Sequence, residues 1–133
     1  MRVFRSQRTG PSSLVDILRS LPPSVTVFVL DGGFLVVGPA GLFVLTQDEG
    51  DLASAARRAA EQADAVRLQL ADELVWVPFV DAMCVTTDAA FDPRQPCLVV
   101  PHDLVAHTIV GGPTTVDNET LAKLRLLRHR VLV

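Results

Sequence analysis

Three short apolar runs between residues 25 and 46 constrain the fold of this chain more than any other feature. They are rich in Val, Leu and Phe, and they predict strands over Val25–Leu30, Phe34–Val37 and Leu42–Thr46. The linkers, residues 31–33 and 38–41, contain the glycines that tight turns favour and are too short for a parallel crossover. The segment therefore predicts an antiparallel meander of three consecutive strands. Because the runs are apolar on both faces, the sheet should be covered on both sides.

A long helix is predicted after the meander, over Leu52–Ala71. Asp51 precedes it as a good N-cap, and its commonest residue is alanine, the best helix former. Apolar residues recur near the 3.6-residue helical period at Leu52, Ala56, Ala59, Ala63, Val66 and Leu70. Charged residues fall largely off this stripe, at Arg57, Arg58, Glu61 and Asp64. We expect Ala59 and Ala63 to face the sheet at close range.

Shorter elements flank these two features. A helix over Leu14–Leu21, stopped by Pro22-Pro23, is predicted before the meander. Two more strands are predicted after the long helix, at Val80–Thr86 and Cys97–Val100.

Two C-terminal helices complete the order. Asp103 is predicted to cap a brief helix that ends near Val110, and Thr115 a last helix that ends near Arg128. The whole order is a helix, a three-stranded antiparallel meander, a long helix, two strands and C-terminal helices. It predicts a mixed α/β fold, an α+β sandwich, in one domain over residues 1–133. Residues 1–11 would form an N-terminal arm or strand, and residues 12–129 the core.

The composition favours a globular intracellular protein. Hydrophobic residues make up 49% of the chain, too many for a disordered protein. The longest apolar run, residues 34–45, is interrupted by Gly and Pro and is too short to span a bilayer. No apolar stretch follows Arg2, Arg5 and Arg8 as it would in an export signal. We therefore expect a cytoplasmic location and no membrane partner.

The charge is unevenly distributed along the chain. The formal net charge is −3, and all acidic residues lie between Asp16 and Glu119, whereas seven of the twelve basic residues lie in the two tails. Arg125, Arg128 and Arg130 are the candidate nucleic-acid contacts in the C-terminal tail. The alternative is that they are ordinary cations at a helix C-terminus, which the helix dipole favours.

The segment FLVVGPAGLFVLT, residues 34–46, resembles the signature of the nuclease-related (NERD) domain family. That family has the restriction-endonuclease-like fold, whose core order of helix, three-stranded meander, helix and strand agrees with the order predicted above. The resemblance can be followed over roughly residues 12–128. Its specific part is the Gly38–Gly41 hairpin with the strands on either side.

The resemblance implies where catalytic residues would lie. Active members of this fold carry a carboxylate at the start of the second strand, and a carboxylate, a spacer and a lysine at the end of the third. These groups hold a divalent cation and position the attacking water. The matching positions here are Gly33, Thr46 and Asp48, and the chain has a single lysine, Lys123. We therefore expect a catalytically inactive domain with no metal or cofactor, which acts as a binding or protein-interaction module.

Two other functions stay open from the sequence. A divergent metal-dependent nuclease would use Asp31, Asp48 and Glu49 as cation ligands, although carboxylates are also ordinary in turns and before helices. A self-associating structural protein would fit the high mean hydropathy of +0.35. The partner would then be a protein or a second copy of the chain, with nucleic acid as a further possibility.

Four more residues, in two pairs, need an interpretation from the sequence. Cys84 with His102 could form a nucleophilic pair, but a thiol inside an apolar strand is expected to be buried and inert. Trp76 and Phe79 flank Pro78 before the fourth strand, and we expect them to pack over the end of the long helix.

Overall fold

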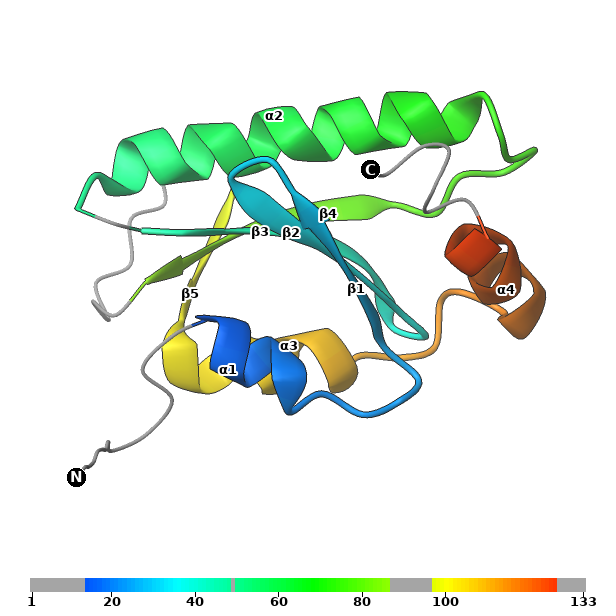
Figure 1. Ribbon diagram of the computed structural model, residues 1–133, viewed down its shortest axis with the longest axis horizontal. Helices are drawn as coiled ribbons and strands as arrows, with labels where there is room; N and C mark the ends of the chain where they lie inside the picture. The colour runs from blue at the N-terminus through cyan, green and yellow to red at the C-terminus, as the bar shows by residue number, and fades with distance from the viewer. Residues whose placement is uncertain (1–13, 49, 87–96, 127–133) are drawn as a thin grey trace.

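The protein is a mixed α/β domain, and its computed structural model describes residues 14–48, 50–86 and 97–126. Within them, five strands form one mixed sheet in the order β1-β2-β3-β4-β5, with helices on both faces (Figure 1). The strands are β1 (Thr26–Leu30), β2 (Gly33–Gly38), β3 (Gly41–Gln47), β4 (Val80–Thr86) and β5 (Leu98–Pro101). The helices are α1 (Leu14–Arg19), α2 (Leu52–Ala71), the 3-10 turn η2 (His102–Leu104), α3 (Val105–Val110) and α4 (Asn118–Leu126).

The predicted antiparallel meander is confirmed. β1 pairs with β2 and β2 with β3, both antiparallel, through the closing pairs Leu30↔Gly33 and Gly38↔Gly41. Gly32 has a φ of +82°, which is why a glycine suits the first turn. β4 then pairs with β3 in parallel, and α2 supplies the crossover that a parallel pair requires. β5 extends the sheet in parallel beside β4.

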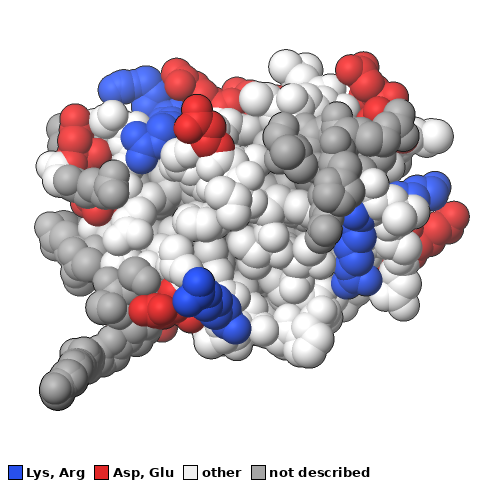
Figure 2. Space-filling view, in the orientation of Figure 1, with Lys and Arg blue, Asp and Glu red and all other residues white. Residues whose placement is uncertain are grey.

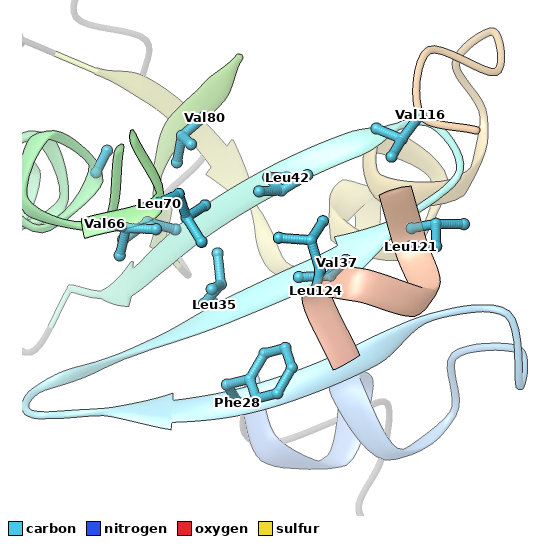
Figure 3. Close-up of a cluster of buried hydrophobic side chains, with 12 residues drawn as sticks. Phe28, Leu35, Val37, Leu42, Val66, Leu70, Val80, Val116, Leu121 and Leu124 are labelled. Carbon is cyan, nitrogen blue, oxygen red and sulfur yellow. The ribbon is translucent and has the colours of Figure 1, made fainter. Parts of the chain in front are cut away.

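Both faces of the sheet are covered, as the two-sided apolar pattern predicts. α2 and α4 lie on one face, where Leu35, Val37 and Leu42 of the sheet pack with Val66, Leu70, Leu121 and Leu124 (Figure 3). α1 and α3 lie on the other face, where Val36, Phe43 and Leu45 pack with Leu14, Ile17, Val105 and Ile109. Alternate residues of β2 and β3 thus enter opposite cores, which fixes the register of these strands.

The long helix is confirmed at its predicted bounds. Its N-cap is Asp51, whose carboxylate accepts a hydrogen bond from the Ser54 amide at 3.1 Å. Ala59 and Ala63 are buried against the sheet, as expected. Their small side chains let α2 approach β3 and β4 closely. No helix within the described ranges is long and apolar enough to cross a membrane.

The two predicted C-terminal caps are wrong. Asp103 lies inside η2, and α3 begins after Leu104 without a side-chain cap. Thr115 does not cap α4; its amide bonds to the carbonyl of Pro39 and its hydroxyl to that of Ala40, at 2.8 and 3.0 Å. α4 begins at Asn118, two residues later than a cap at Thr115 predicts, and the Thr120 amide donates to the carboxylate of Asp117 at 2.7 Å. The tertiary contact with the hairpin thus takes precedence over the local capping preference of Thr115.

Candidate functional site

The end of the sheet at which β3, β4 and β5 finish is the candidate site. β2 is antiparallel to β3 and therefore begins at this same end. Consequently Gly33 at the start of β2 lies beside Thr46 near the end of β3, and Asp48 follows directly after β3. The three positions that correspond to the resembled catalytic residues are brought together here.

Gly33 is packed too tightly to carry a side chain. A Cβ atom at this position would lie 2.6 Å from Oε1 of Gln62 and 2.7 Å from the carbonyl oxygen of Leu45. Gln62 comes from α2, and its side-chain amide donates a hydrogen bond to the carbonyl of Asp31 in the preceding turn. The space that a carboxylate would need is thus occupied by α2.

Thr46 is fully buried and has a structural contact of its own. Its hydroxyl donates to the carbonyl of Ala55 at 2.7 Å, which ties the end of β3 to the first turns of α2. A buried hydroxyl requires such a partner because an unpaired polar group inside the core is costly.

Asp48 is held by three hydrogen bonds at the end of β3. Its amide donates to the carbonyl of Val85 at 2.8 Å. One carboxylate oxygen accepts from the Gly50 amide at 2.9 Å, and the other from the Thr86 hydroxyl at 3.2 Å. Asp48 therefore shapes the turn from β3 into α2 and links it to the end of β4.

An open hollow of about 630 Å³ lies next to these residues. Its polar wall consists of Asp31, Gly32, Gly33, Gln47 and Arg58, and its apolar wall of Val15, Val29, Leu30 and Phe34. Within the described part of the chain, Nε of Arg58 and Oε1 of Gln62 are buried without a hydrogen-bond partner. A small ligand could bind here through an acceptor group that faces Arg58, with its apolar part against the valines.

The structure tests the proposed cation ligands only in part. Asp31 lines the hollow and Asp48 makes the contacts above, while Glu49 lies outside the described residues. Among the residues that are described, no three His, Cys, Asp or Glu side chains gather as a possible metal site. The trio of Asp31, Asp48 and Glu49 stays a prediction.

Cys84 is buried in β4 against Ala55 and Ala56 of α2. Burial raises the pKa of its thiol, which agrees with the expected inert cysteine. Burial also raises the pKa of Cys97, to about 11.

Arg125 is the one predicted nucleic-acid contact that the described residues include. Its guanidinium donates to the Thr26 hydroxyl at 3.2 Å and to the Ser24 carbonyl at 3.4 Å, so it joins α4 to the start of β1. Arg128 and Arg130 lie outside the described residues, and the basic patch stays a prediction.

The expected packing of Trp76 and Phe79 is wrong. Trp76 is 61% exposed and Phe79 70% exposed, and Val75 beside them is also exposed. Their loop connects α2 to β4.

The roles of Gln62 and Arg58 were not predicted from the sequence. Its pattern places Arg58 on the solvated face of the long helix and assigns no role to Gln62. The available signal was their position, each one residue before the buried alanines Ala63 and Ala59. Comparison with known proteins finds no matching family model, no matching curated protein and no matching solved structure.

Proposed function

We propose that this protein is a catalytically inactive domain on a restriction-endonuclease-like scaffold, and that it works as a binding or protein-interaction module. One observation carries the proposal: the positions of the resembled metal site hold Gly33, Thr46 and Asp48, each committed to packing or to main-chain hydrogen bonds. A metal-dependent nuclease would need free carboxylates at two of these positions.

The order of elements supports the scaffold. α1 precedes the meander β1-β2-β3, and α2 then leads to β4 in parallel beside β3. This is the helix, meander, helix and strand order that the resemblance implies.

Exposed aromatic rings support a role in binding proteins. At roughly 150–250 Å² for a whole aromatic side chain, the exposed fractions of Trp76 and Phe79 leave about 200–330 Å² of ring surface in solvent. Trp is among the residues enriched at the energetic centres of protein interfaces. The acidic residues nearby, Asp72, Glu73 and Asp81, favour a protein partner over the phosphate backbone of a nucleic acid.

A cleavage assay tests the proposal that the domain is catalytically inactive. Purified protein is incubated with single- and double-stranded DNA and about 10 mM Mg²⁺ or Mn²⁺, a concentration that fills weak carboxylate sites. We expect no cleavage above the protein-free blank. Cleavage that Asp48→Ala abolishes would instead establish the divergent nuclease.

A binding titration separates a protein partner from nucleic acid. Fluorescence anisotropy with a labelled oligonucleotide compares the wild type with the triple variant Arg125→Ala, Arg128→Ala and Arg130→Ala. If these arginines bound the phosphates of a duplex, the logarithm of the binding constant would fall with the logarithm of the salt concentration, with a slope of about 0.9 for each phosphate contacted. We expect the two proteins to behave alike, because Arg125 is already bonded to β1.

A further inference from the structure

Among the strands that the structure describes, β1 has a neighbour on one side only. β1 pairs with β2 on one side, and none of the described strands pairs with it on the other. The two-residue turn closes on the hydrogen-bonded pair Leu30↔Gly33. Every second residue of β1, counted back from Leu30, therefore directs its peptide groups toward β2, and these residues are Leu30, Phe28 and Thr26. Val27 and Val29 therefore point their peptide N–H and C=O groups toward the open side.

This edge carries none of the usual protection against strand pairing. Natural edge strands are interrupted by charges, prolines or bulges. Residues 26–30, TVFVL, contain no charge, proline or glycine, and Val29 is 73% exposed. Figure 2 shows a white, uncharged area between two blue basic side chains on the face along which β1 runs in Figure 1.

We propose that the open edge of β1 pairs antiparallel with the same edge of a second copy, so that two sheets join into one. The register that pairs all five residues is centred on Phe28. It places Val27 opposite Val29 of the second copy, and both of these residues direct their peptide groups toward the partner. The two contacting strands are then related by a two-fold axis, as the commonest homodimers are.

Charge complementarity supports this register. Asp31 follows β1 directly, and in the proposed pairing it lies beside Val25 of the second copy. Arg125 is bound at that place, because its guanidinium contacts the Ser24 carbonyl and the Thr26 hydroxyl. Each end of the paired strands therefore brings an aspartate of one copy near an arginine of the other.

The opposite side of the sheet does not offer the same contact. The opposite edge strand, β5, has four residues and ends in Pro101, and it pairs with β4 only from Met83 onward, which leaves Asp81 exposed on β4. Two copies that met there would place one Asp81 near the other, and like charges across paired strands are destabilising. The uncharged β1 edge is thus the self-complementary one. This inference goes beyond the proposed function and does not depend on the chemistry at the sheet end.

Sedimentation velocity of the full chain over about 1–100 µM tests the pairing, since this range covers ordinary weak dimers. We expect a species of twice 14.4 kDa that grows with concentration. Val29→Lys should abolish the dimer by placing a charge at the paired edge. The monomer should keep its circular dichroism spectrum, because Val29 is already exposed. A wild type that stays monomeric at every concentration, or a dimer that survives Val29→Lys, would overturn the proposal.

Charge reversal tests the register without replacing any residue of β1. Asp31→Arg and Arg125→Asp should each weaken the dimer, by about 2- to 30-fold in Kd for two exposed ion pairs. The double variant should recover the wild-type Kd. Asp81→Arg, the same charge change at the opposite edge, is the control and should leave Kd unchanged. Failure of the double variant to recover would exclude this register.

Discussion

Replacing Gly33 by alanine should destabilise the fold by overpacking at the start of β2. Gly33 does not have a positive φ, so alanine is compatible with its backbone and the effect is steric. The new Cβ would meet Oε1 of Gln62 at 2.6 Å and the carbonyl oxygen of Leu45 at 2.7 Å. The Gln62 amide can rotate away at the loss of its bond to Asp31, but the Leu45 carbonyl belongs to the middle of the sheet.

Overpacking of this kind costs about 1–3 kcal/mol. For a chain of 133 residues, about 1 kcal/mol corresponds to roughly 3–4 °C in Tm. We therefore expect Gly33→Ala to lower Tm by about 3–12 °C in thermal unfolding followed by circular dichroism. Adding Gln62→Ala should recover only part of the loss, because the contact with the Leu45 carbonyl remains.

Gly112→Ala is the matched control for this substitution. Its Cβ would lie 3.7 Å from the Cβ of Ala40, an ordinary contact distance, so the free energy of unfolding should change by less than about 0.5 kcal/mol. Equal Tm values for Gly33→Ala and the wild type would refute the conclusion that Gly33 has no space for a side chain. The room for a carboxylate at position 33 would then exist after all.

Three further predictions concern the core and the titrating groups. Thr46→Val should cost about 0.5–1.5 kcal/mol in urea unfolding because it removes the hydrogen bond from the Thr46 hydroxyl to the Ala55 carbonyl of α2, whereas Thr46→Ser keeps the bond and most of the stability. Ala63→Leu should cost about 1–3 kcal/mol by overpacking, and the exposed Ala53→Leu should be near neutral; equal losses would place both on one face. The partial burial of the largely exposed Asp81 carboxyl raises its pKa above 3.8, so its stabilising contribution is present below that pH and is lost as pH rises through the raised pKa. Asp81→Asn should therefore stabilise the fold at neutral pH and not at pH values below 3.8, as paired unfolding curves would reveal.

The fold follows from the sequence where local chemistry decides it. The glycines at 32 and 41 fix two tight turns, and the alanine-rich stripe between Asp51 and Ala71 fixes the long helix. The start of α4 could not be predicted in this way. Thr115 has the residue type of a cap, but its hydroxyl and amide are bound to a hairpin 75 residues earlier in the chain.

From the sequence, the candidate site was predictable only as three positions that lack the catalytic residues of the resembled family. Its residues at 33, 46 and 48 were identified from the sequence, but what fills the space between them was not. Gln62 reaches the turn at Asp31 from a helix 31 residues later, and only the packing of α2 across the sheet sets that contact. The exposure of Trp76 and Phe79 was likewise hidden, because a pattern of apolar residues in a loop does not specify which surface covers them.

The polar residues at the sheet end have a physical reason to be there without any catalysis. A short connection leads from β3 into α2, and the main-chain groups along it need partners. Asp48 supplies one to the Gly50 amide in this connection, Thr46 ties β3 to the Ala55 carbonyl in α2, and Gln62 ties α2 to the carbonyl of Asp31 in the turn between β1 and β2. An enzyme of this topology would have to satisfy the same main-chain groups and also keep its carboxylates free for a cation. In the inactive domain that we propose, the side chains meet the first requirement, and the uncharged edge of β1 and the exposed rings before β4 are the surfaces proposed for partners.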